Sequence, residues 1–261
     1  MREGDATSAP PPGARGLLLA ALCAGTLAVS DAADLGTVTD AEIDKVIESV
    51  GTSDTERRVI RRRLAGWKEI AASPKHKGLA DPEKLKLVNE FMHETPFYCD
   101  PVLWCREDYW AKPIELLAND GGDCEDFSIA KYFTLRALGV AEDRLRIVYA
   151  VYQKPGFTGA HMVLAYYPAP DAEPLILDNI NPSLLPASAR PDLVPVFSFN
   201  TQGMWGAKEN KGRGQPVDTP YRAWSDHWKQ VQAEGAVRSV SPEQRKGPEC
   251  QVLIQRSVWC R

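Results

Sequence analysis

Apolar residues recur every three or four positions in the first third of the chain, which is the spacing of an amphipathic helix. Residues 39–42 and 53–56 each have the pattern of a capping box, in which side chains satisfy free N–H groups at a helix start. The two helices that they begin are predicted to end near Gly51 and Trp67. A third helix is predicted to begin at residues 81–82. Its apolar face would consist of Leu85, Val88, Phe91 and Met92.

The middle of the chain predicts a buried helix followed by strands. A helix over residues 124–138 would be apolar on more than one side, which is typical of a centrally buried helix. Short segments rich in Val, Ile, Leu and Tyr follow and are predicted as strands: residues 145–152, 160–167, 174–179 and 194–199. Short links between strands favour antiparallel neighbours. With a further helix over residues 221–234, the pattern predicts an α+β fold: N-terminal helices, then an antiparallel sheet packed on the 124–138 helix.

Composition excludes some classes of partner. The chain has 261 residues and a formal charge of -4, so nothing global favours nucleic acid or an anionic membrane surface. Five arginines do cluster in the second helix, where we interpret them as a solvated face. They are Arg57, Arg58, Arg61, Arg62 and Arg63.

The N-terminus has the pattern of an export signal. Arg2 and Arg15 precede an apolar run over residues 16–29, and small residues at 28–30 resemble a cleavage site. The run is shorter than the roughly 20 residues that span a bilayer, although a retained anchor remains the alternative. We therefore predict a signal peptide over residues 1–30, a single domain over 31–235, and a C-terminal extension over 236–261.

Export changes how the cysteines are interpreted. The sequence has six cysteines, and removal of Cys23 with the signal leaves an odd number. An odd number in an oxidising compartment predicts a free thiol. Proximity alone favours two local disulfides, Cys99 with Cys105 and Cys250 with Cys260, which leaves Cys124 free.

His161 and Asp178 are predicted to face each other across a β-hairpin. If the turn is centred between Ala169 and Pro170, paired residues have numbers that sum to 339, and His161 pairs with Asp178. Directly opposed residues share one face of a sheet, with Cβ atoms about 4.5–5.5 Å apart. A bulge or a register slip would break this pairing. A carboxylate in that place would hold the imidazole in one tautomer, which is half of a nucleophilic site.

Cys124 is the candidate nucleophile. Thiolates are the reactive form of cysteine, and the start of a helix stabilises negative charge. If the sheet packs on the 124–138 helix, the thiol is available to the imidazole of His161. The alternatives are an inert buried cysteine and a surface His161–Asp178 pair. The remaining histidines, His76, His93 and His227, are interpreted as surface residues.

Acidic residues crowd the candidate nucleophile. Asp123, Glu125 and Asp126 flank Cys124, and negative charges this close oppose the formation of a thiolate. Either Asp123 and Asp126 cap the helix, or a cation lies there and reverses the local field. Clustered carboxylates beside glycine-rich loops suit a hard ion such as calcium, and Asp108 is a further possible ligand.

These residues lie in longer stretches that resemble the bacterial transglutaminase-like cysteine peptidase family. The stretches are Gly122-Asp123-Cys124-Glu125-Asp126-Phe127 with Ala130-Lys131-Tyr132, His161-Met162-Val163-Leu164-Ala165-Tyr166-Tyr167, and Pro174-Leu175-Ile176-Leu177-Asp178-Asn179. Further landmarks are Asp108-Tyr109-Trp110-Ala111, Arg190-Pro191-Asp192-Leu193 and Ser198-Phe199-Asn200. The resemblance spans roughly residues 55–234.

The resemblance implies a papain-like fold of the transglutaminase type. It places the catalytic roles on Cys124, His161 and Asp178, and a calcium site on Asp123 and Glu125 with Asp108 as a further ligand. It is strongest to periplasmic members that release a biofilm adhesin. The implied substrate is therefore a large adhesin, cut in its N-terminal region beside small residues. The implied regulator is an inner-membrane cyclic-di-GMP receptor, LapD-like, whose periplasmic domain holds the protease inactive.

Two features depart from the family pattern. The loop that contains Cys99 and Cys105 is usually free of cysteine, and the tail after residue 234 is an extension. Both could change the choice of substrate or regulator. Two other functions also remain open: a transglutaminase or amidase on the same fold, and a non-catalytic module that binds an adhesin or a receptor.

Overall fold

The computed structural model describes residues 36–206, 217, 222–232 and 237–257. The predicted signal peptide over residues 1–30 lies outside these residues. Within them, no helix is both long enough and apolar enough to cross a membrane.

The N-terminal part is helical, as predicted. Helix α1 (Asp40–Val50) and helix α2 (Asp54–Ala72) both begin at capping boxes, formed by Thr39 with Glu42 and by Ser53 with Glu56. The predicted end of α2 near Trp67 is wrong, because the helix continues and buries Ile70 and Ala71. A short helix α3 (Pro74–Lys77) leads to α4 (Asp81–His93), which begins where the sequence predicts. Most of the arginine cluster of α2 is solvent-exposed, as expected.

The C-terminal half forms a six-stranded antiparallel sheet in the order β4-β3-β2-β1-β5-β6. Its central strands are the long ones that the sequence predicts, whereas the short strands β4 and β6 at its edges are not in the prediction. The strands are β1 (Leu145–Lys154), β2 (Phe157–Tyr166), β3 (Leu175–Leu177), β4 (Leu185–Pro186), β5 (Leu193–Asn200) and β6 (Gly203–Gly206). Two 3-10 turns, Glu142–Arg144 and Ala187–Ala189, join elements of the sheet region.

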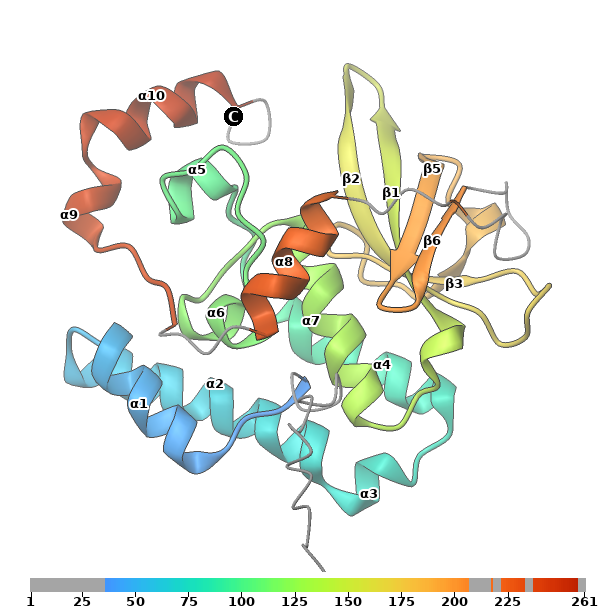
Figure 1. Cartoon of the computed structure of the whole chain (residues 1–261), viewed down its shortest axis with the longest axis horizontal. Coiled ribbons are helices and arrows are strands. Elements are labelled where there is room, and N and C mark those ends of the chain that lie inside the picture. Colours follow the sequence, from blue (N-terminus) through green and yellow to red (C-terminus); the bar gives the residue numbers. More distant parts are fainter. Residues whose placement is uncertain (1–35, 207–216, 218–221, 233–236, 258–261) are drawn as a thin grey trace, which may run out of the picture.

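Helix α7 (Cys124–Ala137) is the centre of the fold. It packs on β2 and is flanked by α4 and by α6 (Pro113–Ala118), so that it lies between the helical layer and the sheet (Figure 1). Its side chains are buried on all sides, including Phe127, Ile129 and Phe133. Full burial of one large apolar side chain stabilises a fold by about 1.5–3 kcal/mol. The α+β architecture and the sheet packed on this helix are as predicted.

The C-terminal residues fold back over the molecule. Helix α8 (Arg222–Gln232) places Trp224 against Phe133 of α7 and Phe199 of β5. Helices α9 (Pro242–Arg245) and α10 (Pro248–Arg256) then lie beside the short helix α5 (Asp100–Leu103), as Figure 1 shows.

The predicted local disulfides are wrong. Cys105 is bonded to Cys250, at a sequence separation of 145 and with Cα atoms 4.6 Å apart. Cys99 is also disulfide-bonded, and Cys124 is the free cysteine among the described residues, as predicted. Proximity in sequence misleads here because α10 packs on α5 and brings Cys250 to Cys105, just after the end of α5.

Candidate active site

The predicted contact between His161 and Asp178 is present. Nε2 of His161 lies 2.8 Å from Oδ1 of Asp178, and both side chains are almost fully buried. The predicted register, however, is wrong by two residues, since Leu164 pairs with Leu177. The turn closes with a hydrogen bond from Ala172 N–H to the carbonyl of Ala169, which moves its centre by one residue. A slip of two keeps the same face of the sheet, so the two side chains meet diagonally.

Asp178 accepts hydrogen bonds on both carboxylate oxygens. Oδ1 accepts from the imidazole and from the N–H of Ile180 at 3.0 Å, while Oδ2 accepts from Nη2 of Arg190 at 2.6 Å. Burial alone would raise the pKa of Asp178, but the bonds from His161, Ile180 and Arg190 together hold its pKa well below the usual range. Asp178 is therefore ionised in the folded protein.

Arg190 and Lys131 both contact Asp178, and neither contact is predicted from the sequence. Arg190 is 3% exposed and also contacts Asp192 at 2.7 Å. Lys131, on α7, donates from Nζ to the main-chain carbonyl of Asp178 at 2.8 Å. Burial lowers the pKa of Lys131 to about 7, against the opposing effect of Asp178. Both residues occur in stretches that resemble the family, which was the available signal, but neither stretch indicates a partner.

Cys124 begins α7 and lines a cavity of about 300 Å³ that His161 also lines. The N–H of Met162, the residue after His161, hydrogen-bonds the sulfur. The predicted meeting of the α7 start with the histidine strand is therefore present in the fold. Gly122 lets the chain turn closely into α7, since a Cβ there would lie only 2.5 Å from a carboxylate oxygen of Asp126.

The electrostatic surroundings of Cys124 favour the thiol over the thiolate. Burial, followed by the carboxylates of Glu125 and Asp123, raises the pKa of Cys124 well above its usual value. The sulfur lies 3.0 Å from Oε2 of Glu125, to which the thiol donates. A positive charge among these acids would be needed to offset their effect on the thiolate.

The predicted metal ligands do lie together, with one addition. Oxygens of Asp100, Asp108 and Glu125 lie within 4.8 Å of one another, as do those of Asp100, Asp123 and Asp126. Asp100 was missed because an Asp-Pro pair is typical of a helix start, which explains the acid without a metal. The N–H of Tyr98 donates to the carbonyl of Gly122 at 2.9 Å, so the residues just before α5 are joined to the residues just before α7.

These acids are poorly compensated by the protein itself. Burial first, and then neighbouring carboxylates, raise the pKa of Asp100 to about 10 and that of Asp108 to about 6. The same causes raise the pKa values of Asp123 and Asp126 well above the usual range. Among the residues that the structure describes, Oδ1 of Asp100 and Oδ1 of Asp123 are buried without a hydrogen-bond donor. An oxygen-rich cluster with such orphaned atoms fits a hard cation.

Asp126 has a different function from its neighbours. Its Oδ1 accepts from the N–H of Ala111 at 2.6 Å and its Oδ2 from the N–H of Asp123 at 3.3 Å. The helix-capping interpretation therefore holds for Asp126, and a free oxygen remains on Asp123.

The interpretation of the other histidines needs correction. His227 is buried, with 3% of its surface exposed, and its Nδ1 lies 3.0 Å from the carbonyl of Trp110. It was expected at the surface, but the apolar face of α8 packs inward and takes His227 with Trp224. His76 and His93 are half-buried.

Comparison with known proteins supports the resemblance. Residues 72–205 match the sequence model of the family described as bacterial transglutaminase-like cysteine proteinase BTLCP. Calcium-bound LapG of Legionella pneumophila is 39% identical, with a TM-score of 0.61, over 74% of this chain and 99% of that one. EGTA-treated LapG from the same organism is 37% identical, with a TM-score of 0.57, over 75% of this chain and 97% of that one. Among curated protein sequences, none matches this chain.

Proposed function

The chain belongs to the bacterial transglutaminase-like cysteine proteinases, and we propose that it hydrolyses peptide bonds with Cys124 as nucleophile, His161 as base and Asp178 as the acid that orients the base. The observation that carries this proposal is the buried His161–Asp178 hydrogen bond of 2.8 Å beside a cavity that the free thiol of Cys124 also lines.

The geometry suggests how the proton moves. Because Nε2 of His161 is bonded to Asp178, Nδ1 is the ring nitrogen that would take the proton from Cys124. The thiolate would attack the carbonyl carbon of the peptide, and N–H groups of the first turn of α7 would stabilise the oxyanion. His161 would then donate its proton to the leaving amine, and a thioester would remain. Water would release the acid and regenerate the thiol.

We further propose that the acid cluster binds calcium. Asp100, Asp108, Asp123 and Glu125 would hold the ion, since their oxygens lie together and two of them lack donors. When bound, a calcium ion would offset the negative field that raises the pKa of Cys124. The solved structures of LapG in calcium-bound and EGTA-treated forms support this assignment by similarity.

The proposed substrate is the N-terminal region of a large surface adhesin, cut beside small residues in the periplasm, so that cleavage would control cell attachment and biofilm release. The proposed regulator is the periplasmic domain of a LapD-like cyclic-di-GMP receptor in the inner membrane. The likeness to LapG supports both ideas, and neither follows from the geometry of the site.

Incubation of the purified protein with an adhesin N-terminal fragment tests the proposal. We expect the wild type to cut the fragment, Cys124→Ala to leave it intact, and the remote variant Ser49→Ala, at an exposed position of α1, to cut at the wild-type rate. Incorporation of a labelled amine into the fragment in place of cleavage would instead favour a transglutaminase. Binding without cleavage by both wild type and Cys124→Ala would indicate a non-catalytic module.

A further inference from the structure

The C-terminal arm, defined here as residues 237–257, lies beyond the segment that matches the family model. It consists of an extended stretch, α9 and α10, and it returns to the side of the molecule where α5 lies (Figure 1).

The arm is attached to the domain along its first residues. The N–H of Arg238 donates to Oε1 of Glu115 at 2.8 Å, and the carbonyl of Arg238 accepts from Asn119 at 2.9 Å. Two residues further on, Val240 is buried with Leu103, Trp104 and Tyr109 in a small apolar cluster around α5. The arm therefore packs on the end of α5 and on the loop over residues 104–109, which includes Asp108 and borders the cavity.

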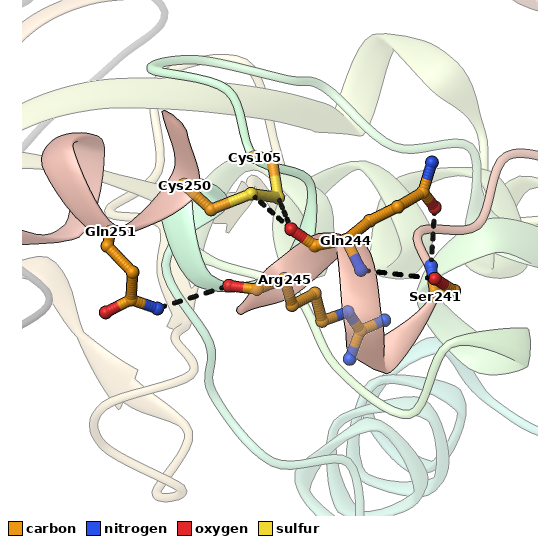
Figure 2. Close-up of a disulfide and its surroundings, with 6 residues drawn as sticks. All are labelled: Cys105, Ser241, Gln244, Arg245, Cys250 and Gln251. Carbon is orange, nitrogen blue, oxygen red and sulfur yellow. Dashed lines mark hydrogen bonds between the residues drawn. A yellow bond between two sulfur atoms is a disulfide. The ribbon is translucent and has the colours of Figure 1, made fainter. Parts of the chain in front are cut away.

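A covalent bond fixes the far part of the arm to the same loop. Figure 2 shows the disulfide between Cys105 and Cys250, with the carbonyl of Gln244 3.1 Å from the sulfur of Cys250. The joint between α9 and α10 is braced by a hydrogen bond from Gln251 to the carbonyl of Arg245 at 3.2 Å. Because both ends of this joint are tied down, α10 is held in one position against α5.

The end of α10 reaches the candidate active site. Ser257, which follows α10 directly, lines the same cavity as Cys124 and His161. On the α5 side the cavity is lined by Phe97, Pro101 and Glu107. A serine is small, so it leaves room in the cavity that a bulky residue in its place would fill.

We propose that the C-terminal arm is a wall of the substrate cleft and that Ser257 is a residue that determines which peptide segments reach Cys124. This inference rests on the proposed function, which it deepens by assigning part of the substrate selection to a segment outside the family's matched region. The disulfide fixes the position of the wall, so the cleft has a set width beside the nucleophile.

Alkylation of Cys124 with reagents of two sizes tests the wall without any need for proteolysis. The full chain is treated with iodoacetamide or with a fluorescein maleimide, and modification is followed by mass spectrometry of the peptide that contains Cys124. We expect Ser257→Trp to slow the maleimide by about tenfold and to leave iodoacetamide nearly unchanged, since only the large reagent needs the space. Val252→Trp is the matched control, because Val252 is 46% exposed on the same helix and does not line the cavity.

A second variant changes the cleft in the opposite direction. Replacement of both Cys105 and Cys250 by alanine removes the crosslink between α10 and the residues that follow α5, so the end of α10 should be held less tightly and the maleimide should react severalfold faster with Cys124 than in the wild type. This variant keeps the test decisive if Ser257→Trp fails to fold. Equal maleimide rates in the wild type, Ser257→Trp and the double variant would contradict the proposal that the C-terminal arm is a wall of the cleft.

Peptide kinetics separate this inference from the proposed function. With a fluorogenic peptide taken from the adhesin fragment, Ser257→Trp should raise KM by about tenfold with kcat changed less than twofold, because the obstacle acts on binding. A wild type that cleaves no peptide would contradict the proposed protease, and a slower maleimide reaction in Ser257→Trp would then still support the wall. A fall in kcat with KM unchanged would overturn the assignment of Ser257 to selection.

Discussion

Asp178 is a buried carboxylate with a hydrogen-bond partner on each oxygen, the imidazole of His161 on one and the guanidinium of Arg190 on the other. A buried acid that lost one of these partners would be left with an uncompensated charge, which typically costs a folded protein about 3–5 kcal/mol. The orientation of the imidazole therefore depends on an arginine that itself does not line the cavity.

Replacement of Arg190 by methionine tests this dependence. Removal of the guanidinium should raise the pKa of Asp178, since the hydrogen bond from Arg190 is one of the causes that hold it low. Activity needs ionised Asp178 to orient His161, so the acid limb of the kcat/KM profile should move to higher pH and kcat should fall by about tenfold or more. The profile is measured on the adhesin fragment between pH 4 and 8.

Two further variants show whether Arg190 acts through its charge. Arg190→Lys should recover part of the activity, because an ammonium can still reach Asp178 but cannot bridge to Asp192 in the same way. Asp192→Asn removes the partly exposed partner alone and should keep the wild-type profile. An unchanged acid limb in Arg190→Met would contradict the argument.

At the scale of single residues, the sequence predicted the contact between His161 and Asp178 but not the further residues that contact them. The spacing of His161 and Asp178 placed them on one face of a hairpin, and an error of two residues in register did not separate them. Arg190 and Asp100 could not be predicted, because the positions of both residues relative to the site depend on tertiary packing. His227 was misjudged for a similar reason, since polar neighbours in sequence do not show which face of a helix packs inward.

Helix α8 is an element whose inward face carries a histidine. Burial lowers the pKa of His227 to about 4, and its ring is packed against Trp110 and Trp224. The folded protein thus keeps this histidine neutral where an unfolded chain, with a pKa of about 6.5, would protonate it.

We expect His227 to make the fold sensitive to mild acid. Between pH 6.5 and about 4 the unfolded state binds more protons at this residue than the folded state, so the free energy of unfolding should fall as the pH is lowered through that window. The loss should be about 2–3 kcal/mol at pH 4 relative to pH 7. Urea unfolding of the wild type and of His227→Gln at several pH values measures it, and the variant should show a flatter dependence. Parallel curves for the two proteins would exclude His227 as the cause.

The C-terminal arm is an element that depends on a long-range crosslink. The disulfide between Cys105 and Cys250 spans 145 residues, and closure of so long a loop restricts the unfolded chain strongly. Replacement of both cysteines by alanine should lower the free energy of unfolding by about 2–4 kcal/mol. Urea unfolding measures the loss, with Val252→Ala as a control on the exposed side of α10. A loss below about 0.5 kcal/mol, the size typical of surface substitutions, would mean that the arm contributes little to the fold.

The pairing of Cys105 with Cys250 could not be predicted from local sequence patterns, although the helices and strands could. The helices and the long strands follow from local patterns of capping and apolar spacing, and the structure confirms them. The disulfide follows from the packing of α10 on α5, and no local pattern specifies which distant element a tail will cover. The free thiol was predicted from the odd number of cysteines that remains once the predicted signal with Cys23 is removed, even though the partners were not.

At the scale of the whole molecule, several acidic side chains gather at one site. The formal charge of the chain is only -4, but Asp100, Asp108, Asp123 and Glu125 gather where the α5 loop meets the start of α7. Like charges in a buried site destabilise the fold in which they lie, so the ion-free protein carries a cost that a bound cation would remove. Stability and calcium should therefore be linked across the whole domain.

A variant of Asp100 separates the cost of the crowded acids from the gain on calcium binding. Asp100 was not predicted as a ligand from the sequence, and it lies with the predicted ligands in the structure. In the presence of EGTA, Asp100→Asn should be more stable than the wild type, by on the order of 1–3 kcal/mol, since the wild-type carboxyl must take up a proton to lie buried among the other acids, whereas the amide is neutral and keeps an acceptor for the N–H of Tyr109. With calcium the order should reverse. The wild type should gain about 2.7 kcal/mol at a calcium concentration 100 times Kd, and the variant should gain much less. Thermal unfolding in EGTA and across a calcium titration measures both, with exposed Asp171→Asn expected to follow the wild type throughout. If Asp100→Asn gained as much from calcium as the wild type, Asp100 would not be a ligand, and the orphaned oxygen on this side chain would need another explanation.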